Sequence, residues 1–405
     1  MRTGPTNKEN GSVHDTGLIL TGGGARAAYQ VGVLSALMEI IEKDSGTECV
    51  MPFSIICGSS AGAINAASLA SHASDPKHGI NRLEQLWSSL RTEMVYASDA
   101  ISLMQTGSRW LGVLALGWVF PSLRKQKPYS LLDNGPLRTL LSSTISFDQI
   151  KQNLDSGYLG ALAITATAYN TGEHLTFYQS EITIKPWQRS SRKAIPCDIG
   201  IDHLMASSAI PFVFPAEVIK VGSQAHWCGD GSMRQLAPMS PAIHLGASRI
   251  MVIGTAYDDE IHPDHAHSES EYPSLAQIGG HVLSNIFIDS LAMDIERMSR
   301  INELLAKMPA DGLKSQSLRP VQSLVITPSE SLDLLALKHV SDMPRAARTL
   351  FRAIGVSPKS VRPTGGALIS YLLFEASYTQ ALISLGRKDC FNRSQEVKDF
   401  FKESS

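Results

Sequence analysis

A serine between two glycines and a run of three glycines are the features of this chain best suited to chemistry. Ser60 lies in Gly58-Ser59-Ser60-Ala61-Gly62, which fits the G-x-S-x-G pattern of a tight turn between a strand and a helix. The run Gly22-Gly23-Gly24-Ala25-Arg26 precedes it, and glycines let backbone N–H groups approach an anion closely. A nucleophilic hydroxyl beside an anion-binding loop is the minimum equipment for acyl transfer.

A base is the next requirement, because a serine hydroxyl is a poor nucleophile at neutral pH. The sequence Cys228-Gly229-Asp230-Gly231-Ser232 offers a carboxylate between two glycines. An Asp-Gly pair is more often an ordinary turn. Because Ser60 needs a base, we interpret Asp230 as its candidate partner.

The three glycines also fit another pattern. Gly22-x-Gly24-x-x-Ala27 after a strand matches a dinucleotide-binding fingerprint, which needs an acidic residue at the end of the second strand. Glu42 and Asp44 precede that strand, and the strand leads directly into the turn that carries Ser60. The sequence therefore favours anion binding for acyl transfer over nucleotide binding.

The elements that must position these residues are two strand–turn–helix units in succession. Apolar runs at 18–20 and 53–57 precede the two turns, and helical patterns at 25–42 and 61–72 follow them. This alternation predicts an α/β fold with parallel strands and crossover helices. Further elements are expected as strands at 159–167, 249–255 and 323–327, a helix at 283–305, and a mainly helical tail from about 332.

Taken together, these residues resemble the patatin-like phospholipase family. The resemblance rests on the GGGAR loop, the GSSAG turn, the DGS triplet and ASSAIPFVFP at 206–215, with a strand and turn at 165–173. The order and spacing agree over about 17–255 and through the helices to about 327. The family implies a three-layer α/β/α fold with a central, mostly parallel sheet.

The resemblance also implies a mechanism with two catalytic residues. Ser60 would be the nucleophile, and Asp230 would be the base that takes its proton. The substrate would be an acyl lipid whose ester forms an acyl-enzyme, which water then hydrolyses. We expect no cofactor and no metal.

The remaining site residues follow from the same motifs. Backbone N–H groups of Gly23 and Gly24 would stabilise the oxyanion, and Arg26 would be the basic residue that closes the loop. The implied set is Gly22, Gly23, Gly24 and Arg26 for the oxyanion hole, Gly58 and Gly62 for the nucleophile elbow, and Gly231 for the aspartate loop.

Two positions depart from the family pattern. Ser232 replaces the small third residue that usually follows the Asp-Gly pair. The segment 234–238 (RQLAP) lacks the asparagine that commonly precedes its proline. Neither change removes a catalytic group, but the second leaves the support of the aspartate loop open.

Three other functions compete with this interpretation. An α/β-hydrolase with a Ser–Asp–His triad places its histidine last, and the last histidine here, His339, lies in a helical pattern. A lipid-binding protein without activity would not need Ser60, Asp230 and the glycine loop together. An acyltransferase that passes the acyl group to an alcohol would use the same residues.

Composition bears on the binding partners and the cellular location of the protein. The formal charge of −2 over 405 residues gives no basic surplus for binding nucleic acid. Five scattered cysteines without a C-x-x-C pair indicate a reducing compartment, so we expect a cytoplasmic location. The histidines at 262, 265 and 267 are better explained by a solvated loop than by a metal site. Nothing in the sequence indicates an oligomeric state.

No stretch of the chain reaches the roughly 18–20 apolar residues that span a bilayer. The run at 110–121 (WLGVLALGWVFP) is most simply a buried helix or covering loop. The alternative is peripheral membrane contact through 110–127, with Trp110 and Trp118 at the headgroup level and basic residues beside anionic lipid. The predicted organisation is a polar tail at 1–15 without the apolar core of a secretion signal, a catalytic domain at 16–330 and a helical extension at 331–405.

Overall fold

The computed structural model describes residues 16–46, 50–98, 130–256, 272–287, 289–309, 318–357 and 364–402. Its strands form one ten-stranded sheet within these residues. The strands are β1 (Thr16–Leu20), β2 (Ile55–Ser59), β3 (Ala161–Ala168), β4 (His174–Ser180), β5 (Gln188–Arg189), β6 (Arg192–Pro196), β7 (Glu217–Val221), β8 (Gln224–Gly229), β9 (Arg249–Ile253) and β10 (Gln322–Ile326).

The centre of the sheet is parallel, as the sequence predicts. The order β10-β9-β1-β2-β3 contains only parallel pairs, with Leu18 opposite Ile56 and Met251. Strand β4 runs antiparallel to β3, and β6 and β5 continue the sheet beyond it. Strand β8 pairs antiparallel with the end of β3, and β7 pairs with β8. The predicted α/β fold with a mostly parallel sheet is therefore confirmed.

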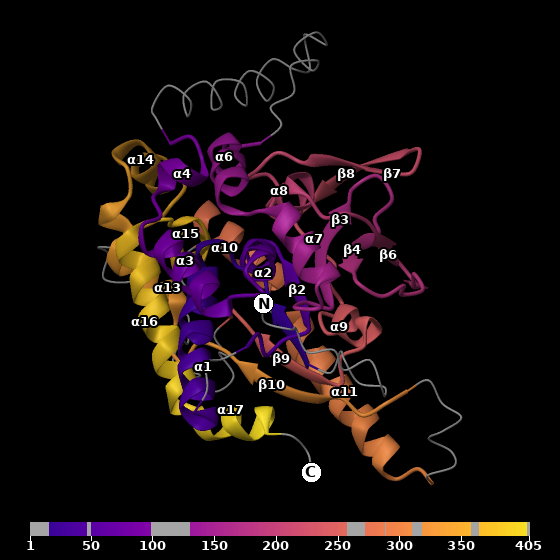
Figure 1. The fold of residues 1–405 in the computed structure, drawn as a ribbon. Coiled ribbons are helices and arrows are strands. Elements are labelled where there is room, and N and C mark those ends of the chain that lie inside the picture. The colour runs from indigo at the N-terminus through magenta and orange to yellow at the C-terminus, as the bar shows by residue number, and fades with distance from the viewer. Residues whose placement is uncertain are drawn as a thin grey trace.

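Helices cover both faces of this sheet (Figure 1). The described residues up to 256 contain η1 (Gly24–Ala27), α1 (Ala28–Ser45), α2 (Ala61–Ser71), α3 (Pro76–Ser88), α4 (Thr92–Val95), α6 (Gly135–Thr144), α7 (Phe147–Asp155), α8 (Ile201–Ser207) and α9 (Ser240–Leu245). The described residues from 272 onward contain α10 (Leu275–Phe287), α11 (Asp289–Ala306), α13 (Leu332–His339), η3 (Val340–Asp342), α14 (Arg345–Ala353), α15 (Gly366–Leu372), α16 (Ala376–Asn392) and α17 (Ser394–Phe401).

Alternating side chains of each central strand supply two separate cores. Leu18 and Ile56 belong to the core beneath α1, α2 and α3, whereas their neighbours Ile19 and Cys57 belong to the core on the other face, beneath α9 and α11. Strands buried on both faces read as continuous apolar runs, which is why the sequence shows these strands clearly. The result is the three-layer α/β/α arrangement.

Two helical patterns differ from their prediction. The pattern at 25–42 begins with a separate 3-10 turn, because Gly24 has a φ of 54° and the Arg26 N–H donates to the Gly23 carbonyl. The pattern at 283–305 belongs to two helices, α10 and α11. Apolar spacing continues across the break between them, so periodicity alone does not reveal it.

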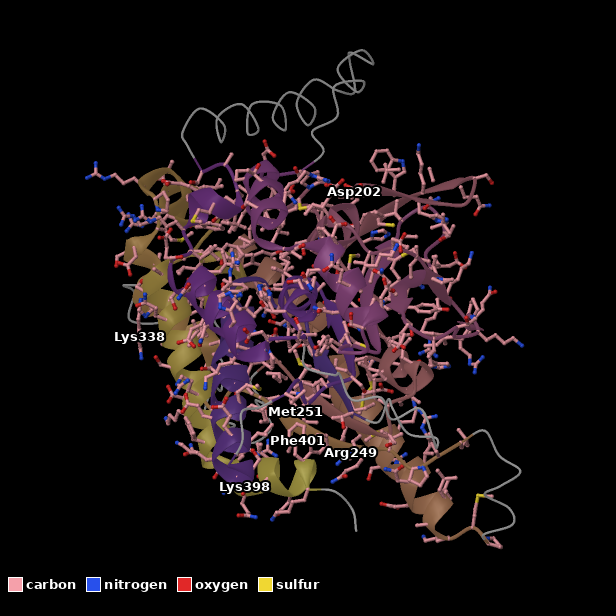
Figure 2. All side chains as sticks on the ribbon, in the orientation of Figure 1. Asp202, Arg249, Met251, Lys338, Lys398 and Phe401 are labelled. Atoms are coloured by element: carbon pink, nitrogen blue, oxygen red, sulfur yellow. The ribbon has the colours of Figure 1, made fainter. Side chains whose placement is uncertain are left out.

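The C-terminal helices pack on the N-terminal part of the chain. In Figure 1, α16 runs beside α1 for most of its length. Figure 2 shows Lys398 and Phe401 on the last helix, where Lys398 Nζ lies 3.2 Å from Asp44 Oδ1 and the Phe401 ring packs edge-on against Phe53. The predicted domain boundary between residues 330 and 331 stays a prediction.

None of the described helices is by itself both long and apolar enough to cross a membrane. Helices α15 and α16 reach that length and composition only as a pair, across a bend of 96°. The segment 110–127 and the histidines at 262, 265 and 267 lie outside the described residues.

Candidate active site

Ser60 lies on a tight turn between β2 and α2, at the edge of the sheet where the parallel strands end. Its φ of 53° and ψ of −131° are unusual for a residue with a side chain, so the surrounding structure must hold this conformation. A Cβ at Gly62 would collide with the carbonyl oxygens of Leu20 and Thr21, so only glycine fits there. At Gly58, a Cβ would collide with the first turn of α2.

Asp230 is the hydrogen-bond acceptor for this serine. Ser60 Oγ donates to Asp230 Oδ2 over 2.6 Å, and the second carboxylate oxygen, Oδ1, accepts the N–H of Ser232 at 2.8 Å. Asp230 directly follows β8, and the antiparallel pairing of β8 with β3 brings it to the end of β2. Both Ser60 and Asp230 are almost fully buried.

Burial changes the acidity of this carboxyl. It raises the pKa of Asp230 from 3.8 to about 6, although hydrogen bonds from Ser60 and Ser232 favour the ionised form and oppose the shift. Asp230 is therefore mainly ionised at neutral pH, yet basic enough to accept a proton. Perturbed carboxyls of this kind are frequent at catalytic sites.

Backbone hydrogen bonds fix the loop that carries Asp230. The Asp230 N–H donates to the Ala209 carbonyl at 2.9 Å, and the Gly231 N–H donates to the Ser207 carbonyl at 3.0 Å. Ser207 Oγ also accepts the Ser60 N–H at 2.9 Å. The segment 206–215 therefore holds the serine turn and the aspartate loop together.

Side chains of β3 and β4 support the same loop from the other side. Thr167 Oγ1 lies 3.0 Å from the Asp230 carbonyl, and His174 Nε2 lies 3.0 Å from the Gly231 carbonyl. Burial lowers the pKa of His174 to about 4, so its ring is neutral near pH 7 and Nε2–H donates to this carbonyl. Arg234, in the segment without the family asparagine, donates to the Gly172 carbonyl at 2.9 Å. These contacts supply the support that the sequence left open.

The glycine loop lies beside Ser60 with backbone donors available. Within the described part of the chain, the N–H groups of Gly23 and Gly24 donate to no protein acceptor. The carbonyl of Gly22 accepts a hydrogen bond from Thr255 Oγ1, at the end of the neighbouring strand β9. Unpaired N–H groups at such a position suit a developing negative charge.

Arg26 occupies a different place from the backbone donors. Its guanidinium is buried and contacts Ser370 and Asp333 of the C-terminal part of the chain. Gly24 lines the pocket at Ser60, whereas Arg26 does not. The side chain of Arg26 therefore belongs to the outer side of the loop.

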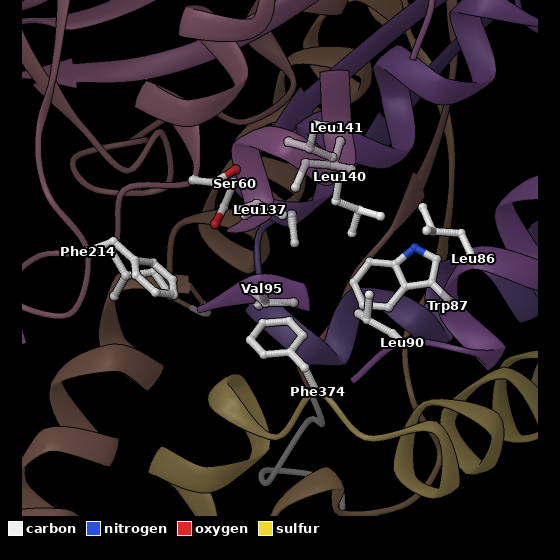
Figure 3. A pocket seen from close by; sticks show the side chains of 15 residues that line it. Ser60, Leu86, Trp87, Leu90, Val95, Leu137, Leu140, Leu141, Phe214 and Phe374 are labelled. Atoms are coloured by element: carbon white, nitrogen blue, oxygen red, sulfur yellow. The ribbon is translucent and has the colours of Figure 1, made fainter. Parts of the chain in front are cut away.

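An apolar pocket of about 540 Å³ opens at Ser60 (Figure 3). Ser60 lies at one side of it, and Trp87 and Leu90 lie across the cavity. Ser208 also lines the pocket, and its buried hydroxyl has no hydrogen-bond partner among the described residues. The apolar lining comprises Ala61, Ile64, Leu86, Trp87, Leu90, Val95, Leu137, Leu140, Leu141, Ile210, Phe214 and Phe374.

The arrangement offers no support for a histidine triad within the described residues. None of the histidines there makes a hydrogen bond with Ser60 or Asp230. His339 lies in α13 and faces Asp342, with Nδ1 and Oδ2 3.5 Å apart.

Several residues at the site were not predicted individually from the sequence. Ser207 and Ser208 lie in the motif at 206–215, to which the sequence assigns no role for either serine. Thr255 lies at the end of a predicted strand, and ligands of α/β sheets bind at the ends of parallel strands, so this position could have indicated it. Phe374 and the partners of Arg26 have no local signal. Asp333 and Ser370 lie more than 300 residues along the chain from Arg26, and Phe374 lies far along the chain from Tyr96, whose ring it contacts.

Comparisons with known proteins identify a family for most of the N-terminal part of this chain. A family model described as patatin-like phospholipase matches residues 18–243. No curated protein matches the chain. Membership in the matched family is consistent with lipid acyl hydrolase activity.

The chain is also similar to solved structures of bacterial proteins. VipD from Legionella pneumophila is 11% identical with a TM-score of 0.34, and 95% of this chain and 67% of that chain are covered. The type III effector protein ExoU is 13% identical with a TM-score of 0.34, and 96% of this chain and 54% of that chain are covered. This chain thus spans about half the length of the ExoU structure. Because the family model covers more than half of its residues, the protein belongs to the patatin-like phospholipase family.

Proposed function

We propose that this protein hydrolyses fatty-acyl esters of lipids through a Ser60–Asp230 dyad. Ser60 Oγ attacks the ester carbonyl while its proton passes to Asp230 Oδ2, and the tetrahedral intermediate expels the lipid alcohol as it takes up that proton. Water then attacks the resulting acyl-enzyme, again with Asp230 as the base, and releases the fatty acid. The observation that carries the proposal is the 2.6 Å hydrogen bond between Asp230 and Ser60, which lines an apolar pocket.

Three features support this chemistry. The pKa of about 6 suits Asp230 to accept a proton near neutral pH. The N–H groups of Gly23 and Gly24 are available for the oxyanion, and each such donor is typically worth about 3–4 kcal/mol in the transition state. The apolar lining of the pocket suits an acyl chain, whose burial contributes about 0.8 kcal/mol per methylene.

Transfer of the acyl group to an alcohol instead of water would use the same residues. The two reactions differ only in what attacks the acyl-enzyme. Assays that follow both the free fatty acid and new esters, with and without an added alcohol, distinguish them.

The test is an assay of purified protein against phospholipids, lysophospholipids and triacylglycerols. We expect Ser60→Ala and Asp230→Asn each to lower turnover by a factor of about 10³ or more, because residues of one catalytic unit act together. Ser156→Ala and Asp198→Asn are matched controls at exposed positions away from the pocket and are expected to retain activity. Retained turnover in Ser60→Ala would contradict the mechanism.

A further inference from the structure

The glycine loop is held from outside by the C-terminal part of the chain, beyond the region that the family model matches. Arg26, two residues after the candidate donor Gly24, donates from Nε to Ser370 Oγ at 2.8 Å and from Nη2 to the same oxygen at 2.6 Å. Its Nη2 also lies 2.5 Å from Asp333 Oδ1. Ser370 Oγ and Asp333 Oδ1 are 3.0 Å apart, which closes a network of three residues.

A second contact joins the same two segments. The Arg26 guanidinium lies 3.9 Å from the centre of the Tyr371 ring, within cation–π range. Gly24 approaches the Tyr371 backbone so closely that a Cβ would collide with its carbonyl. Residues 370–371 therefore contact both a side chain of the glycine loop, that of Arg26, and the loop backbone at Gly24.

We propose that Ser370 and Asp333 are positioning residues of the active site, which fix the oxyanion donors of Gly23 and Gly24 by holding Arg26. This inference rests on the proposed function, because it assigns a role within the same site. The donors lie in a short loop, and the Arg26 N–H donates to the Gly23 carbonyl at 3.1 Å. The position of Arg26 thus sets the conformation of the backbone just before it.

The chemistry of the network suits a permanent support. Arginine is charged throughout the ordinary pH range, and its planar fork holds two acceptors in a fixed direction. Ser370 is fully buried and Arg26 almost fully, whereas the Asp333 side chain is 39% exposed. On the opposite side of the glycine loop, Thr255 Oγ1 donates to the Gly22 carbonyl. The loop is therefore bonded both to Thr255, just beyond β9, and to the C-terminal segment.

The same C-terminal segment completes the pocket. Phe374 follows α15, which carries Ser370, and its ring lines the cavity together with Ser60 (Figure 3). Tyr96 donates to the Leu372 carbonyl at 3.1 Å, which ties this turn to the neighbourhood of α4. One helix and turn therefore both hold the loop and form a wall for the substrate.

Ser370→Ala and Asp333→Ala test the inference by kinetics with a soluble ester. A 1 Å displacement of a catalytic group can cost about 100-fold in rate, so we expect kcat to fall about tenfold or more with KM within about twofold. The pH dependence set by Asp230 should not move. Asp333→Asn keeps the acceptor oxygen and should retain more activity than Asp333→Ala.

Ser329→Ala is the matched control. Ser329 Oγ donates to Asp389 Oδ1 at 2.6 Å, so this variant also removes a Ser–Asp hydrogen bond of the C-terminal segment but leaves Arg26 untouched. We expect its kcat to match that of the wild type. An equal loss of kcat in Ser329→Ala and Ser370→Ala, or no loss in Ser370→Ala, would overturn the inference.

Amide hydrogen exchange provides a readout that does not need activity. In Ser370→Ala and Asp333→Ala, a peptide covering 21–27 should exchange faster, while a peptide covering 55–60 should not change. Unchanged exchange at 21–27 would refute the positioning role even if the wild type hydrolysed no ester. If Ser370→Ala does not fold, the Asp333 variants provide the test, because the Asp333 side chain is partly exposed to solvent.

Discussion

Ser60 Oγ and Asp230 Oδ2 lie 2.6 Å apart although 170 residues separate them. Three strands bring them together, because Ser60 directly follows β2, Asp230 directly follows β8, and β3 pairs with both strands. Both residues are almost fully buried, so the hydrogen bond lies in a medium where electrostatic interactions are strong.

Hydrolysis should depend on the ionisation of Asp230. Burial raises its pKa to about 6, and only the ionised form can accept the proton of Ser60. We expect kcat/KM for a soluble ester to rise with pH through about 6 and to be roughly tenfold lower at pH 5 than at pH 7.5. A flat profile between these values would exclude Asp230 as the base.

Asp230→Asn should stabilise the folded protein at neutral pH. The folded protein keeps a proton on Asp230 up to about pH 6, whereas the unfolded chain releases it near 3.8, so stability is lost as pH rises between these values. Each pKa unit corresponds to about 1.4 kcal/mol, so the ionised carboxylate costs roughly 3 kcal/mol. Chemical denaturation should show a gain for the variant at pH 7.5 that shrinks at pH 4. Equal gains at both pH values would contradict this cause.

Ser208→Ala should lower activity without changing stability. The buried hydroxyl of Ser208 has no partner among the described residues, so its removal breaks no hydrogen bond of the folded protein there. If it binds the substrate ester, kcat/KM should fall about two- to tenfold, as expected for one hydrogen bond. Thermal unfolding should be unchanged. If kcat/KM of Ser208→Ala equals that of the wild type, the hydroxyl makes no contact with the substrate.

Leu90→Trp should shorten the acyl chain that the pocket accepts. Leu90 lies across the cavity from Ser60, so a larger ring there fills the far end (Figure 3). We expect KM for a long-chain ester to rise about tenfold, while a short-chain ester is turned over as by the wild type. A loss for both esters, with unfolding at lower temperature, would indicate damage to packing instead.

Membrane contact through 110–127 is a prediction from the sequence, since this segment lies outside the described residues. Replacing both Trp110 and Trp118 with serine should weaken binding to anionic liposomes, because indole rings favour the headgroup region. Turnover of a soluble short-chain ester serves as the control and should stay nearly intact. Unchanged liposome sedimentation of the double variant would disprove the contact.

The sequence by itself determined the local units of the site. Apolar runs buried on both faces marked the central strands, and Gly58 and Gly62 marked a turn that only small residues fit. The carboxyl ends of parallel strands meet at one edge, so the glycine loop and Ser60 could be placed together from two strand–turn–helix units. These features depend on neighbouring residues and on strand direction, which short stretches of sequence encode.

Only the tertiary structure decided which distant residues meet. The sequence suggested Asp230 because a base was needed, but the pairing of β8 with β3 sets its distance from Ser60. Arg26 was expected to close the loop, and the fold pairs it with Ser370, 344 residues further along the chain. No local pattern encodes such a contact, because it arises only when α15 packs against the glycine loop.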